Sequence, residues 1–122
     1  MKKLKEFQKF DVLKFIKGKE FTIKEIKEDF EYKNGVRTDS VKGSVIKLLI
    51  TKDETIYSDG TQGNNLFEVF NLKTPYLVSQ LSELKQGDKI DDIKQFGTLT
   101  GVVYGQYANE LSISATPKNL ND

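Results

Sequence analysis

The sequence predicts a mainly β fold, a five-stranded barrel with one helix between the third and fourth strands. Three observations support this fold class. Residues 21–116 mostly alternate between apolar and polar side chains or form short β-branched runs, both typical of strands. An Asn-Gly pair at 34–35 indicates a hairpin. A single segment, which begins at residues 74–75, has helical spacing and a favourable helix start.

The chain has 122 residues, a length that suits one domain. We divide it into a basic N-terminal arm (1–19), a body (20–116) and a short polar tail (117–122). The arm carries seven lysines and two acidic side chains, whereas the remainder carries twelve basic and sixteen acidic ones. A basic arm on a slightly acidic body indicates contact with a polyanion or with an acidic neighbouring subunit.

Apolar side chains recur every three residues in the arm, at Leu4, Phe7, Phe10 and Leu13. One expectation is an amphipathic helix that packs on its own domain and stops at Gly18. The other is an extended or swapped arm, through which these four residues dock on a second subunit. Lysines interrupt the apolar run, so the arm does not resemble a signal peptide, and we expect a cytoplasmic protein.

The first two strands are expected to form a hairpin. The first covers residues 21–32, and a break in its alternation at 24–25 predicts a β-bulge. The turn at 34–35 then leads into a return strand at 41–51. Gly43, near the start of that strand, suits a position where a small barrel bends sharply.

A long polar loop (52–65) separates this hairpin from the third strand at 66–72. A helix is expected next, because Thr74-Pro75 supplies a good N-cap and first-turn residue. Its apolar stripe would consist of Leu77, Leu81 and Leu84, and Gly87 stands where the helix would end.

The last two strands are expected at 98–104 and 110–116, with a turn between them. Gly101 is a second candidate bend, and residues 89–96 fit no single element. The expected order of elements is therefore three meander strands, one helix and two further strands. This is the order of the five-stranded OB barrel.

The sequence contains no cysteine and no histidine. It therefore lacks a thiolate nucleophile, a zinc knuckle and any Ser–His or Cys–His pair. Asp88, Asp91 and Asp92 lack the spacing of a calcium loop and are interpreted as a solvated turn. No window has the roughly 18 apolar residues of a membrane span. We therefore expect a non-enzymatic protein without a cofactor, a metal or membrane association. An enzyme that uses only carboxylates remains a third hypothesis, after the two binding functions given below.

Single-strand binders combine aromatic rings for base stacking with cations that follow the backbone. In an OB barrel the ligand crosses the second and third strands and meets the loops between strands one and two and between strands four and five. The predicted nucleic-acid-binding residues are therefore Lys33, Arg37 and Lys42 in the first loop, Lys47 and Lys73 beside the sheet, Tyr57 in the long loop, and Tyr104 and Tyr107 at the last turn.

Several of these aromatic residues have a structural alternative. Tyr104 lies in an apolar run and is equally suited to the core, and Tyr57 is suited to covering the long loop. Phe67 and Phe70 have opposite parity in the third strand, so one should enter the core while the other faces a ligand.

Three segments carry a resemblance to a known family: FTIKEIKEDFEYKNGVRTDSVKGSVIKLLI, LFEVFNLKT and TLTGVVYGQYANELSISA. In style and architecture the chain resembles the OB-fold single-stranded DNA-binding proteins of conjugative plasmids, integrative elements and phages of Gram-positive bacteria. The resemblance implies a protein that coats transient single strands, often as an oligomer. One departure is the C-terminal KNLND, which lacks the acidic tail and hydrophobic tip of housekeeping single-strand binders.

The leading hypothesis is a sequence-tolerant, non-enzymatic single-stranded DNA-binding protein of a mobile element, acting in conjugation or in plasmid or phage replication. RNA is an alternative ligand, and self-association through the N-terminal arm is expected. The runner-up is a protein–protein adaptor of a mobile element that uses an OB-like barrel and the Phe-rich arm.

Overall fold

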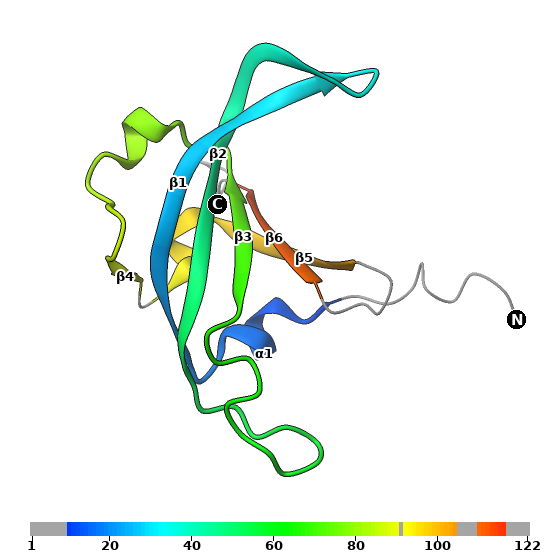
Figure 1. Cartoon of the computed structure of the whole chain (residues 1–122), viewed down its shortest axis with the longest axis vertical. Helices are drawn as coiled ribbons and strands as arrows, with labels where there is room; N and C mark the ends of the chain where they lie inside the picture. Colours follow the sequence, from blue (N-terminus) through cyan, green and yellow to red (C-terminus); the bar gives the residue numbers. More distant parts are fainter. Residues whose placement is uncertain (1–9, 91, 105–109, 117–122) are drawn as a thin grey trace, which may run out of the picture.

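The computed structural model describes residues 10–90, 92–104 and 110–116. Within them the fold is mainly β, as predicted, and one sheet curls into an open half-barrel (Figure 1). Its six strands are β1 (Lys19–Lys33), β2 (Val36–Asp53), β3 (Val69–Thr74), β4 (Lys89–Ile90), β5 (Thr98–Tyr104) and β6 (Glu110–Thr116). The expected count of five strands was wrong, because β4, with only two residues, is too short to show an alternating pattern.

The strand order across the sheet is β4-β1-β2-β3-β6-β5. Neighbouring strands are antiparallel except β3 and β6, which run parallel. The predicted bounds of the last two strands, 98–104 and 110–116, are confirmed. The third strand begins at Val69 instead of residue 66, because residues 64–67 form a turn.

The hairpin of β1 and β2 is longer than expected. Asn34 and Gly35 both have positive φ, 52° and 79°, which confirms the tight turn. The predicted bulge is also confirmed by a register shift between Ile23 and Glu25. Pairing of β2 with β3 begins only at Ser44. Residues 30–41 therefore pair with one another alone and project from the sheet; we call them the hairpin arm (Figure 1).

The helix expected after residues 74–75 was wrong. Only the short 3-10 segment η2 (Val78–Leu81) forms there. Leu81 is buried, but Leu77 is 42% exposed, so the three leucines do not make one buried stripe.

Tertiary contacts explain why the helix does not form. The Ser44 hydroxyl donates to the Tyr76 carbonyl at 2.7 Å, and the Leu77 amide donates to the Gln80 side chain at 2.7 Å. The Ser44 bond holds the chain extended before η2, and the Gln80 bond caps the start of η2 at Leu77, so no helix begins at residues 74–75.

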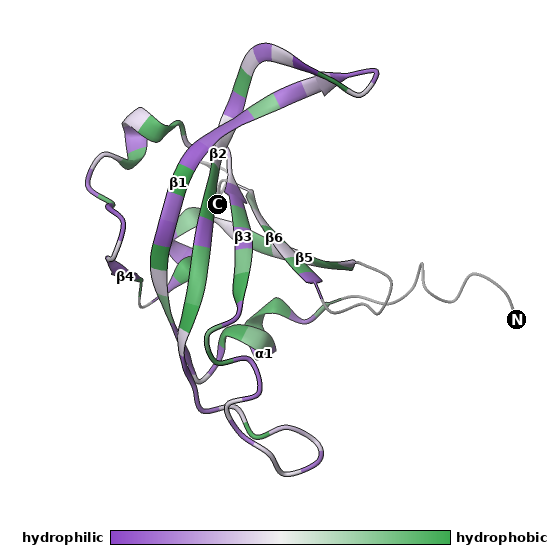
Figure 2. Ribbon diagram, viewed as in Figure 1, coloured by the Kyte–Doolittle hydropathy of each residue, from purple (hydrophilic) through white to green (hydrophobic). Residues whose placement is uncertain are grey.

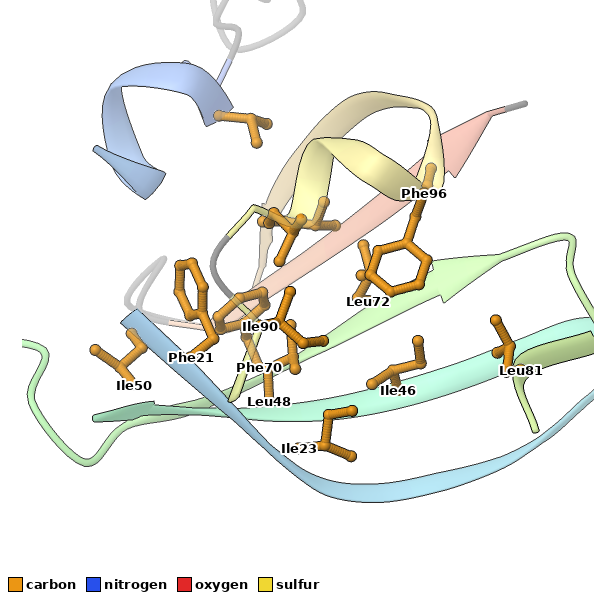
Figure 3. Packing of buried hydrophobic residues seen from close by; sticks show 14 residues of the cluster. Phe21, Ile23, Ile46, Leu48, Ile50, Phe70, Leu72, Leu81, Ile90 and Phe96 are labelled. Atoms are coloured by element: carbon orange, nitrogen blue, oxygen red, sulfur yellow. The ribbon is translucent and has the colours of Figure 1, made fainter. Parts of the chain in front are cut away.

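Apolar side chains from most of the strands fill the inner face of the sheet. Phe21 and Phe70 meet edge to face with centroids 5.5 Å apart, and Ile46, Leu48 and Leu72 are fully buried beside them. Figure 3 shows this cluster between the sheet and the 3-10 segment η3 (Ile93–Phe96). The hydropathy colours of Figure 2 show that most of the short helix α1 (Val12–Ile16) is apolar as well.

The N-terminal segment packs on its own chain where it is described. Asp11 caps α1 through the Lys14 amide, and Gly18, with φ of 75°, follows the helix as expected. Phe10 forms a β-bridge to Gly101 on β5. The helix is thus shorter than the spacing predicted. None of the helices in residues 10–90, 92–104 and 110–116 is long and apolar enough to cross a membrane.

Candidate nucleic-acid interface

The face of the sheet opposite the core presents two rows of side chains. Residues paired across neighbouring strands point to the same side of a sheet. The pairing registers therefore define two rows that continue from β2 to β5, which together we call the outer face. The first row is Val45, Lys73, Ser114 and Thr100, and the second is Lys47, Asn71, Ser112 and Val102.

Two of the predicted cations lie on this outer face. Lys73 is exposed between Val45 and Ser114, and Lys47 is half-buried beside Asn71. Diagonal neighbours on adjacent strands are about 7–8 Å apart, so the structure brings these two lysines together. Neither amine forms an ion pair with a described residue, although Glu25 is opposite Lys47 on β1.

Hydroxyl and amide groups surround the two lysines. Ser112 and Ser114 lie on the same face of β6, on either side of Ile113, and Asn71 lies between Lys47 and Ser112. Such neutral donors bind phosphate oxygens without reading base identity. This part of the outer face can therefore hold a phosphate chain in a sequence-tolerant way.

The other predicted cations lie on or beside the hairpin arm. Lys33 and Arg37 are exposed, and the Arg37 guanidinium stacks on the Phe30 ring at 3.8 Å. The arm also carries Glu31 and Asp39, so its charges balance. Lys42 is exposed at the base of the arm.

The predicted aromatic residues are dispersed. Tyr104 is 46% exposed at the end of β5, where Glu110 is its partner. Tyr107 lies outside the described residues. Tyr57 is half-buried, and its hydroxyl donates to Asp53 at 2.6 Å and accepts from the side-chain amide of Asn65 at 2.6 Å. The structural alternative for Tyr57, that it covers the long loop, agrees with these bonds.

The Tyr57 bonds belong to a buried polar network at the end of β2. Lys19 and Asp53 pair at 3.4 Å with side chains that are 1% and 0% exposed. Burial and the bond to Asp53 raise the pKa of the Tyr57 hydroxyl. Burial lowers the pKa of Lys19, while the charge of Asp53 opposes that shift. The network anchors the loop that precedes β3.

The expected oligomerisation residues are only partly described. Leu4 and Phe7 lie outside the described residues. Phe10 packs against Phe15 of its own chain, with centroids 5.3 Å apart, and Leu13 is 61% exposed.

Asp88 and Asp92 each accept a bond from a nearby backbone amide, at Lys85 and Lys94, and Asp91 is not described. Among the described residues no group of three acidic, His or Cys side chains could hold a metal ion.

Several outer-face residues were missed by sequence reasoning. Asn71, Ser112 and Ser114 become neighbours of the lysines only through the β3–β6 pairing, which no local pattern reveals. Phe67 and Phe70 were the two candidates for an exposed aromatic side chain on the third strand, and the structure shows which of them is exposed. Phe70 is 4% exposed in the core, whereas Phe67 is 70% exposed.

Comparisons of the chain with protein-family models, with curated proteins and with solved structures gave no match.

Proposed function

We propose that this chain is a non-enzymatic, sequence-tolerant single-stranded DNA-binding protein of a mobile element, built on a six-stranded variant of the OB barrel. The succession β1-β2-β3-β6-β5, a meander followed by a returning hairpin, supports the barrel assignment. The family resemblance of residues 21–116 supports the mobile-element context, which includes conjugation and plasmid or phage replication in the cytoplasm.

The observation that carries this proposal is the pair of lysines on the outer face. Lys47 and Lys73 are free of ion pairs among the described residues and are bordered by Asn71, Ser112 and Ser114. Cations bind the phosphates of any sequence, and hydroxyl and amide donors position the backbone. Such a surface suits an extended single strand that lies across β2, β3 and β6.

Fluorescence anisotropy with a labelled oligo-dT of about 30–60 nucleotides tests the proposal, at 50 and 200 mM salt. Binding should weaken at the higher salt. Each lost phosphate contact flattens the log–log salt slope by about 0.7 for single strands, so Lys47→Ala/Lys73→Ala should flatten it by about 1.4. Lys85→Ala, an exposed lysine on another part of the surface, is the matched control and should change nothing.

Absence of binding at 50 mM salt and tens of micromolar protein would refute the proposal. An unchanged slope in the double variant would move the site away from the outer face. Duplex DNA and RNA competitors then determine which nucleic acid is preferred.

A protein–protein adaptor is the second candidate, and the hairpin arm favours it. Tyr32 is 65% exposed and Val36 is 67% exposed on a segment whose charges balance. The pairs Tyr32–Arg37 and Lys33–Val36 place these two side chains on opposite faces of the arm. Exposed apolar side chains on an arm without net charge suit a protein partner better than a polyanion. Contact through this arm would persist at high salt, unlike phosphate binding.

Self-association through the N-terminal arm is also part of the proposal. The exposed Leu13 supports it, since this large apolar side chain on α1 is available to a second copy. Light scattering of a variant that lacks residues 1–9 and carries Leu13→Ser tests it, and an unchanged mass in an oligomeric protein would exclude this role.

A further inference from the structure

Phe67 has a backbone conformation that disfavours a bulky side chain. Its φ is 66°, in the left-handed region. The Phe67 amide donates to the Ile50 carbonyl at 2.8 Å, and the Ile50 amide donates to the Glu68 carbonyl at 2.9 Å. Two residues thus oppose one, which is a β-bulge. Glycine is the usual residue where a bulge or turn needs positive φ, so phenylalanine here is strained.

Packing does not compensate for this strain. The Phe67 side chain is 70% exposed, in contrast to Phe70, which packs edge to face on Phe15 and Phe21. Backbone strain at an exposed residue points to a function of that side chain.

The ring stands at the entrance to β3, in the turn that leads into the strand. Val69, Asn71 and Lys73 alternate along the strand, and Asn71 and Lys73 belong to the outer face. Phe67 lies two residues before Val69, in the turn and the bulge, where strand alternation no longer fixes the direction of a side chain. Six extended residues span at most roughly 20 Å, so the exposed ring and the Lys73 ammonium are within reach of one short single strand.

The turn that carries the ring is held from within the protein. The Glu68 amide donates to the Asn65 carbonyl at 3.1 Å, which closes the turn. The Asn65 amide donates to the buried Asp53 carboxylate at 3.0 Å, and the Asn65 side chain donates to Tyr57 at 2.6 Å. Because the turn is held in place, its backbone loses little conformational freedom when a ligand stacks on the Phe67 ring.

We propose that Phe67 is a stacking platform for an unpaired base of a single strand whose phosphates lie near Lys73. This inference rests on the proposed function and adds a base contact to it. Every base has a π-face, so such stacking is tolerant of sequence, as the lysine contacts are.

A tryptophan at position 67 reports stacking directly, because the native chain contains no tryptophan. The emission of Phe67→Trp should be quenched when oligo-dT is added. Leu77→Trp, which introduces the probe at a residue 42% exposed beside η2, is the control and should show no quenching. Equal quenching of both probes, or of neither, would overturn the stacking role.

Phe67→Gly separates binding from folding. Loss of one stacked base should weaken oligo-dT binding about 5- to 150-fold. The midpoint of thermal unfolding should stay unchanged or rise by a few degrees, because glycine accepts positive φ. Asn34→Gly, at φ of 52° in the exposed hairpin turn, is the matched control and should leave DNA affinity unchanged.

The outcomes distinguish the two proposals. If the native chain binds no single strand, both fail. If the native chain binds and Phe67→Gly retains its full affinity, only the stacking role fails. A fall of about 5 °C or more in the unfolding midpoint of Phe67→Gly would show that the ring serves folding, and would overturn the inference.

Discussion

Asp53 and Lys19 form a buried ion pair where β1 begins and β2 ends, and Asp53→Asn tests how much this pair contributes to folding. The Lys19 amine also donates to the Phe15 carbonyl at 2.8 Å and to the Thr55 hydroxyl at 2.9 Å. With the ion pair at 3.4 Å, the ammonium therefore has three partners although it is almost completely buried. Removing the charge of Asp53 leaves a buried cation without a counter-ion.

The magnitude follows from the pKa of Asp53. Burial alone would raise it, but three hydrogen bonds, from the Tyr57 hydroxyl and the amides of Asn65 and Thr55, outweigh that effect. Together with the charge of Lys19 they lower the pKa of Asp53 from 3.8 to about 2. At 1.36 kcal/mol per unit, the ionised carboxylate stabilises the fold by about 2 kcal/mol. The unpaired Lys19 adds to the loss, so we expect Asp53→Asn to cost about 3–5 kcal/mol at pH 7.

Urea unfolding between pH 7 and pH 2 measures both effects. Because the folded-state pKa is depressed, the stabilisation is complete above about pH 4 and is lost as the pH falls toward 2. Asp53→Asn should lack this part of the pH dependence. The double variant Lys19→Met/Asp53→Asn should be more stable than Asp53→Asn alone, since it has no orphan charge. A loss below about 1 kcal/mol, or a double variant no more stable than the single one, would refute the reasoning.

Three further predictions concern close contacts. Gly43→Ala should destabilise the fold by more than about 1 kcal/mol in urea titrations, because its φ is 154° and a Cβ would meet the Thr74 carbonyl; an unchanged midpoint would contradict this close approach. Gly101→Ala should speed amide exchange in α1, because a Cβ would collide with the Phe10 ring that docks on β5; unaltered exchange would show that the bridge tolerates the methyl group. Phe70→Ala should cost about 3–5 kcal/mol in urea, since the ring is 4% exposed, and a loss under about 1 kcal/mol would place it outside the core.

Features set by neighbouring residues were predictable from the sequence. The last two strands have a clear β-branched pattern and tight bounds, and both were placed correctly. The Asn-Gly turn and the bulge at Ile23–Glu25 were also predicted, because turn chemistry and side-chain parity are local properties.

Features that depend on residues distant in the sequence were not predictable from it. The helical spacing of Leu77, Leu81 and Leu84 was overridden by Ser44, which bonds to the chain more than thirty residues away. The two-residue strand β4 is defined by its pairing with the start of β1, about seventy residues earlier, which no local pattern reveals.

The same distinction applies to the candidate site. Lys47 and Lys73 could be proposed from the order of strands, but Asn71 and the two serines of β6 become their neighbours only once the registers are known. Parity alone reduced the candidates for an exposed aromatic ring to Phe67 and Phe70. The strained φ of Phe67 is visible only in the structure.

The salt dependence of binding can decide how much of the predicted surface a single strand uses. If it touches only Lys47 and Lys73, the log–log slope should be about −1.4. If Lys33, Arg37 and Lys42 also reach phosphates, five contacts give about −3.5. The balanced charges of the hairpin arm favour the smaller value, because Glu31 and Asp39 repel the strand that Lys33 and Arg37 attract. A slope steeper than −3.5 would require cations beyond these five, and residues 1–9, which contain four lysines, are one source of them. Removing residues 1–9 should then flatten the slope to about −3.5, whereas a slope that stays steep would exclude residues 1–9 as a DNA contact.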